Sequence, residues 1–199
     1  MTRKGLLIDF GGVLTSNVFS SFAAFCVAEG LEPETMRTAF RGDPTARQLL
    51  FDLEIGTLEP HAFSVALAER LGLDDPTDLP QRLFAGVRPD EAMIAEVRSL
   101  HDRGVRTGLV SNSWGDATAY DRELFAEIFD GVVISSEVGL RKPDPAIYAL
   151  GARTIGLEPA DCVFVDDLGG NLKPAAALGM ATIKHVDTTQ TIAQLRQLL

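Results

Sequence analysis

The chain has 199 residues, of which 46% are hydrophobic and 23% charged. This length and composition are typical of a globular protein with a sizeable core, and they exclude small disulfide-stapled scaffolds and disordered chains. The formal net charge of −10 disfavours nucleic acid as a partner, because a polyanion would be repelled, although a pocket with a few amides, a lysine and a metal ion can still bind a small anion.

A short apolar run over Gly5 to Asp9 is followed at once by Gly11 and Gly12, and this predicts a buried strand that ends in a turn. The next stretch, residues 16–88, carries large apolar side chains at helical intervals, interrupted by glycines and prolines. The pattern predicts an all-helical insertion after the first strand. We expect its aromatic side chains to form a core of their own.

After the insertion, segments with helical spacing alternate with short runs rich in β-branched residues. Helices are expected over Asp90 to Asp102 and over Pro145 to Ile155. Further strands are expected at Val105 to Val110, Val132 to Ser135, Cys162 to Val165 and Ala181 to Ile183. Such alternation implies a mostly parallel sheet covered by helices on both faces. We therefore predict the α/β class, with residues 1–15 and 89–199 as the core domain and residues 16–88 as a small helical domain.

Ligands of parallel α/β sheets bind beyond the carboxyl ends of the strands, and polar residues follow several of the predicted strands. Asp9 leaves the first strand just before Gly11 and Gly12, whose backbone amides could approach a phosphate closely. Ser111 and Asn112 close another strand with a hydroxyl and an amide. Each of these two patterns, taken alone, is as typical of ordinary turn or cap residues.

Two further groups at the same edge carry charge. Lys142 precedes a proline in front of a helix, where it could neutralise a phosphate or a carboxylate. Asp166 and Asp167 directly follow a wholly apolar strand, and adjacent carboxylates repel each other unless a cation or hydrogen-bond donors compensate. This pair favours a hard metal ion.

Taken together and in this order, the four groups resemble the motifs of the haloacid dehalogenase-like superfamily, and the resemblance covers nearly the whole chain. The helical insertion resembles the C1 cap of subfamily IA. The first motif resembles the subgroup related to the N-terminal phosphatase domains of epoxide hydrolases. The resemblance implies a Rossmannoid sheet with a cap, and a Mg²⁺-dependent phosphatase that acts on a small phosphorylated metabolite.

The resemblance also implies a role for each motif residue. Asp9 would attack phosphorus and form an aspartyl-phosphate that water then hydrolyses. Asp9, the backbone carbonyl of Gly11 and Asp167 would hold Mg²⁺, with Asp166 as an additional or indirect ligand. Lys142 would balance the negative charge during catalysis. The residues expected to bind the phosphoryl group are Gly11, Gly12, Ser111, Asn112 and Lys142.

Position 11 departs from the family pattern. Phosphatases of the superfamily usually carry a second aspartate two residues after the nucleophile, which protonates the leaving oxygen and later activates water. Gly11 has no side chain that could move a proton, and losing such help typically costs about 10² to 10⁴ in rate. Either the substrate is activated, as anomeric and acyl phosphates are, or another group, such as one from the insertion, transfers the proton.

Two other functions stay open at this stage. A 2-haloacid dehalogenase would use Asp9 to attack carbon without a metal, but that branch usually has tyrosine at position 11 and does not need the pair Asp166 and Asp167. A catalytically weak regulatory protein would keep the phosphate pocket and lack turnover. Arg41 or Asp43 in the insertion is a candidate for the edge of the pocket.

The N-terminal apolar run covers only Leu6 to Ile8, which is too short for a signal peptide or a membrane span. The only cysteines, Cys26 and Cys162, favour buried free thiols in a reducing compartment. We therefore expect a cytoplasmic protein, a monomer or homodimer, that contacts neither membranes nor nucleic acid.

Overall fold

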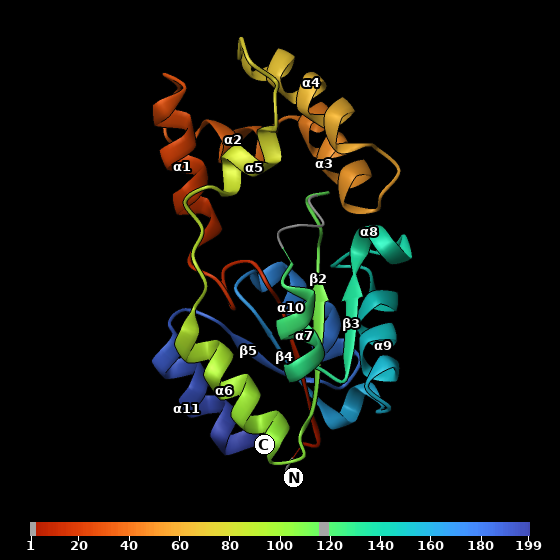
Figure 1. Ribbon diagram of the computed structural model, residues 1–199. Helices are drawn as coiled ribbons and strands as arrows, with labels where there is room; N and C mark the ends of the chain where they lie inside the picture. The colour runs from red at the N-terminus through yellow and green to blue at the C-terminus, as the bar shows by residue number, and fades with distance from the viewer. Residues whose placement is uncertain (1–2, 116–119) are drawn as a thin grey trace.

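The computed structural model describes residues 3–115 and 120–199 of the chain (Figure 1). The described residues form a five-stranded sheet in which all neighbours are parallel, in the order β3-β2-β1-β4-β5. The strands are β1 (Gly5–Ile8), β2 (Arg106–Ser111), β3 (Gly131–Ile134), β4 (Cys162–Asp166) and β5 (Ala181–Lys184). The predicted parallel α/β sheet is confirmed, and each strand boundary lies within one residue of the expected one.

The central strand β1 explains why the sheet is covered on both faces. Leu7 pairs with Gly108 of β2 on one side and with Phe164 of β4 on the other. Leu6 and Ile8 point into one hydrophobic cluster and Leu7 into a second one, because successive side chains of a strand face opposite ways. The first cluster is covered by α6 (Glu91–Asp102), α7 (Arg122–Ile128) and α11 (Thr188–Leu198), and the second by α9 (Pro145–Thr154) and α10 (Gly169–Ala177).

Most of these covering helices are preceded by an aspartate that caps their first turn. The side chain of an aspartate at the N-cap accepts a hydrogen bond from a backbone amide of the first turn, which stabilises the helix start. These aspartates are Asp90, Asp121, Asp144 and Asp187, before α6, α7, α9 and α11. A short helix, α8 (Ser135–Val138), follows β3 directly. Ser135, which the sequence placed in the strand, is therefore the first residue of this helix.

The insertion forms a second group of helices beyond the carboxyl ends of the strands (Figure 1). Its members are α1 (Val18–Ala28), α2 (Thr35–Gly42), α3 (Pro44–Glu54), α4 (Pro60–Leu71) and α5 (Leu79–Phe84). They share a hydrophobic cluster that includes Phe22, Phe25, Phe63 and Leu67. The insertion therefore has its own core, as its apolar spacing predicts.

The two connections between the insertion and the sheet run next to each other. Thr15 and Pro89 form an antiparallel bridge, and the backbone amide of Ser16 donates to the carbonyl of Arg88 at 2.7 Å. The amide of Asp90 donates in turn to the carbonyl of Leu14 at 2.9 Å. The chain thus leaves and rejoins the core at one place.

Two expectations about the chain as a whole can be compared with the structure. Cys26 and Cys162 are both buried and free, as predicted. Within the described ranges, every helix is either too short or too polar to cross a membrane.

Candidate active site

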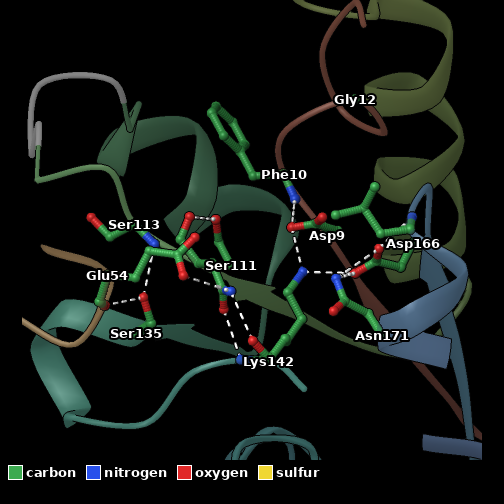
Figure 2. A network of polar contacts seen from close by, with 12 residues as sticks. Asp9, Phe10, Gly12, Glu54, Ser111, Ser113, Ser135, Lys142, Asp166 and Asn171 are labelled. Atoms are coloured by element: carbon green, nitrogen blue, oxygen red, sulfur yellow. Dashed lines mark hydrogen bonds and ion pairs between the residues drawn. The ribbon is translucent and has the colours of Figure 1, made fainter. Parts of the chain in front are cut away.

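Three strand ends bring the predicted polar side chains together (Figure 2). Asp9 follows β1, Ser111 ends β2 and Asp166 ends β4, and β1 pairs with both of the other strands. A cavity of about 390 Å³ lies between this edge of the sheet and the helices of the insertion. Side chains from both parts of the chain line it, which makes it the natural place for a ligand.

Lys142 lies between two carboxylates beneath this cavity. Its Nζ atom is 2.6 Å from Asp9 Oδ1 and 2.8 Å from Asp166 Oδ2, and the lysine is only 1% exposed. Burial acts to lower the pKa of Lys142, but the charges of Asp166 and Asp9 outweigh it and raise the pKa above its ordinary value. The amine therefore stays protonated and holds a fixed positive charge next to Asp9.

Asp166 is held from several sides. Besides Lys142, the side-chain amide of Asn171 donates to both carboxylate oxygens at 3.0 Å, and the backbone amide of Leu168 donates to Oδ1 at 2.8 Å. The residue is fully buried and does not line the cavity. Asp166 is thus held in place and orients Lys142.

Three carboxylates could together hold a cation. One oxygen from each of Asp9, Asp166 and Asp167 lies within 4.8 Å of the others. Burial, together with repulsion from Asp166, raises the pKa of Asp9 to about 8 and that of Asp167 to about 6, although Lys142 acts to lower both. A cation would relieve this repulsion, and oxygen donors are the ligands that Mg²⁺ prefers. The donor set therefore fits Mg²⁺.

The glycines after Asp9 take different positions. Gly11 lines the cavity, whereas Gly12 does not, and the Gly12 amide donates to the hydroxyl of Thr15 at 3.0 Å. A Cβ atom on Gly12 would lie 2.8 Å from Asp167 Oδ2, and the φ angle of Gly12 is +76°. Gly12 is therefore needed for the close approach of Asp167, while its amide is already engaged.

Asn112 and Ser111 both line the cavity. The Asn112 side chain accepts from the Lys142 amide at 2.8 Å and donates to the Lys142 carbonyl at 3.1 Å, so it fixes the segment that carries the lysine. The Ser111 hydroxyl lies 3.1 Å from the hydroxyl of Tyr120. Tyr120 was not among the predicted residues, because nothing in its sequence context distinguishes it from a core aromatic.

The insertion supplies an aromatic wall and positive charge. Trp114, from the loop after β2, packs among four phenylalanines of the insertion, at centroid distances of 5.1 to 6.1 Å: Phe22, Phe40, Phe63 and Phe84. Arg37 and Arg41 of α2 also line the cavity. Asp43 does not line it and instead pairs with Arg70. Of the two residues expected at the pocket edge, the structure thus places only Arg41 there.

Glu54, the last residue of α3, is a cavity residue that the motifs did not reveal. It is 5% exposed, pairs with Arg141, and lies with Oε2 3.4 Å from the Asn112 amide nitrogen. Burial raises its pKa to about 7, although Arg141 acts to lower it. The sequence does contain a signal: Glu54 follows Leu50 by four residues, which places a carboxylate on the apolar face of a helix.

Comparison with known proteins agrees with this arrangement. A family model described as haloacid dehalogenase-like hydrolase matches residues 3–179. Bifunctional epoxide hydrolase 2 of Sus scrofa is 38% identical over 111 residues, which cover 53% of this chain and 20% of that protein. Sesquiterpene phosphatase astK of Aspergillus oryzae is 31% identical over 150 residues, which cover 73% of this chain and 76% of that protein. The match therefore spans about a fifth of the epoxide hydrolase and about three quarters of the fungal phosphatase.

A solved structure shares the fold. The HAD family enzyme bt-2542 from Bacteroides thetaiotaomicron, in its magnesium complex, has a TM-score of 0.68 and 21% sequence identity, over 93% of this chain and 94% of that chain. At this level of identity the likeness shows the fold alone.

Proposed function

Since this chain belongs to the haloacid dehalogenase-like hydrolase family, we propose that it is a Mg²⁺-dependent phosphatase that cleaves a small phosphate monoester through an aspartyl-phosphate on Asp9. The observation that carries the proposal is the cluster of three carboxylates around Lys142 at the floor of a cavity. Burying so much charge is costly, and a catalytic role for Asp9 accounts for it.

The residues of the cluster would divide the work between them. The carboxylate of Asp9 attacks phosphorus, and the fixed charge of Lys142 offsets the repulsion between this carboxylate and the anionic phosphoryl group. The Ser111 hydroxyl and the Gly11 amide would hold the phosphoryl oxygens, since the Gly12 amide already donates to Thr15. Asp9, the Gly11 carbonyl and Asp167 would hold Mg²⁺, which would supply positive charge that lowers the cost of bringing the two anions together.

We assign residues 16–88 as a cap that selects the substrate. The aromatic wall around Trp114 faces the same cavity as Asp9, so the alcohol part of the ester would be apolar, and Arg37 and Arg41 would attract its phosphate. The relative from A. oryzae is named a sesquiterpene phosphatase, which agrees with an apolar ester.

The test is a phosphate-release assay on a panel of esters, including alkyl and terpenyl phosphates and glycerol phosphate, with MgCl₂ or with EDTA. We expect turnover only with MgCl₂ and a higher kcat/KM for the apolar esters. Asp9→Asn keeps the size of the side chain but removes the nucleophile, so activity should fall at least about 10³-fold. Asp74→Asn, at an exposed position, is the matched control and should retain full activity.

The same protein preparations separate the alternatives. Phosphate binding without turnover of any ester would indicate a regulatory protein instead. Chloride release from a 2-haloacid in EDTA, lost in Asp9→Asn, would indicate a dehalogenase. Either result would overturn the proposed phosphatase.

A further inference from the structure

The mechanism needs a proton donor opposite Asp9. In phosphoryl transfer the attacking and leaving oxygens lie roughly in line, so the leaving oxygen faces away from Asp9 and toward the insertion. Gly11 offers no side chain, and a Cβ atom there would lie only 3.2 Å from Val18 Cγ2. The Val18 side chain at the start of α1 would therefore have to shift slightly to admit a side chain at position 11.

The insertion places one buried carboxyl group, that of Glu54, at the cavity. Glu54 and Asp9 both line the cavity, and Figure 2 shows them on either side of Ser111. The backbone carbonyl of Glu54 accepts a hydrogen bond from the buried hydroxyl of Ser135, which ties the end of α3 to the core. The end of α3 is thus held against the core, and the carboxyl group of Glu54 is held in turn by Arg141.

The other ionisable groups that line the cavity are less suited to this role. Lys142 is held between two carboxylates, and arginine side chains do not lose their proton in proteins. Asp167 belongs to the set that fits the cation. Burial raises the pKa of Tyr120, and its hydroxyl is engaged with Ser111. Among the described residues, Glu54 is the remaining carboxyl group of the cavity.

We propose that Glu54 is the acid-base residue of this enzyme and replaces the aspartate that related phosphatases carry at position 11. This inference rests on the proposed function. An ion pair with Arg141 alone would not require the carboxyl group of Glu54 to line the cavity, whereas an acid-base role does.

The surroundings of Glu54 agree with proton transfer near neutral pH. Burial raises its pKa, while two cations from the segment before α9, Arg141 and Lys142, act to lower it, and the result is about 7. Arg37 and Arg41 are further charged groups of the same cavity. An acid-base residue is most effective when its pKa lies near the working pH.

The two chemical steps balance with this one group. In the first step Asp9 forms a bond to phosphorus, the phosphorus–oxygen bond of the ester breaks, and the leaving oxygen takes the proton of Glu54 to give the alcohol. In the second step water attacks the aspartyl-phosphate and gives a proton to the Glu54 carboxylate. The bond from phosphorus to Asp9 breaks, which yields inorganic phosphate and restores both carboxyl groups.

The test compares Glu54→Gln with wild type on two esters of different leaving groups. The value of kcat/KM covers the steps up to departure of the leaving group. For an alkyl phosphate, which needs protonation, kcat/KM should fall about 10² to 10⁴-fold. For p-nitrophenyl phosphate, whose leaving group departs without a proton, it should change less than about fivefold. The variant should also release a burst of one nitrophenol per enzyme, because the second step is slow.

The pH profile gives an independent readout. With the alkyl phosphate, kcat/KM of wild type should decline as the pH rises above about 7, because Glu54 loses its proton, and Glu54→Gln should lack this decline. Arg141→Gln breaks the same ion pair but keeps the carboxyl group. The ratio of kcat/KM for the two esters should therefore stay as in wild type. Asp52→Asn, at a half-buried position of α3 that does not line the cavity, is the matched control and should resemble wild type.

The outcomes are distinguishable from failure of the proposed function. If wild type hydrolyses neither ester, the phosphatase itself is refuted. If wild type hydrolyses both and Glu54→Gln slows both equally, or Arg141→Gln reproduces the same pattern, Glu54 has only a structural role and the inference is wrong.

Discussion

Lys142 places a protonated amine between two buried carboxylates, Asp9 and Asp166. Such an arrangement is a weak source of net stability, because all three groups have lost their hydration. Removing one partner is strongly destabilising, because the remaining charges are then buried without compensation. Replacing the lysine should therefore lower the free energy of unfolding.

We expect Lys142→Met to lower the free energy of unfolding by about 3 to 5 kcal/mol and to abolish phosphatase activity. Urea denaturation without divalent cations measures the first effect. Lys173→Met, at an exposed position on α10, should change stability by less than about 0.5 kcal/mol. A cost below about 1 kcal/mol for Lys142→Met would contradict the account of Lys142 as the compensating charge.

The motif residues and Glu54 differ in how well the sequence reveals them. Asp9 and Ser111 stand at strand ends, and in a parallel sheet chain direction alone brings such ends to one edge. Their gathering could therefore be predicted. The position of Glu54 depends on how α3 docks on α8, which no local pattern encodes. For the same reason the sequence could name Arg41 and Asp43 as edge residues but could not distinguish the one that lines the cavity.

At the scale of helices, the contact of α3 with α8 sets the position of Glu54. Gly56 follows α3 with a φ angle of +75°, and a Cβ atom there would lie 2.6 Å from the Ser136 carbonyl oxygen. Gly72 at the end of α4 has a similar φ angle of +71°, but a Cβ atom there would meet nothing within 4 Å. A substitution at either glycine would strain the backbone, but only a substitution at Gly56 would also clash with α8.

Gly72→Ala should cost about 1 to 2 kcal/mol of stability from the left-handed backbone alone. Gly56→Ala should cost at least about 1 kcal/mol more, because the backbone of α8 must also move. It should in addition lower kcat/KM for alkyl phosphates, whereas Gly72→Ala should not. Thermal denaturation and the phosphate assay measure both effects. Equal costs for the two variants would show that α3 does not depend on this contact.

At the scale of the whole molecule, a net charge of −10 includes the three carboxylates clustered at the cavity. The raised pKa of Asp167, about 6 instead of 3.8, means that its charged form destabilises the fold near neutral pH when no cation is bound. Its stability contribution falls as the pH rises from about 4 to 6, because the folded state binds the proton more tightly than the unfolded state. A bound cation should reverse the effect.

Mg²⁺ at a hundred times its dissociation constant should add about 2.7 kcal/mol of stability and raise the Tm by about 5 °C or more. Asp167→Asn should abolish this gain at the same concentration, yet be at least as stable as wild type in EDTA at pH 7.5. Differential scanning calorimetry with NaCl at matched ionic strength checks both statements. An unchanged gain in Asp167→Asn would exclude Asp167 from the cation site.

The paired connections at Ser16 and Arg88 have a consequence for how such an enzyme can diversify. The whole insertion begins and ends at a single junction next to the sheet. We therefore expect that one helical insertion could be exchanged for another at this junction without disturbing the strand before Asp9. In this molecule, however, such an exchange would also remove Glu54, so a transplanted cap would have to bring its own proton donor.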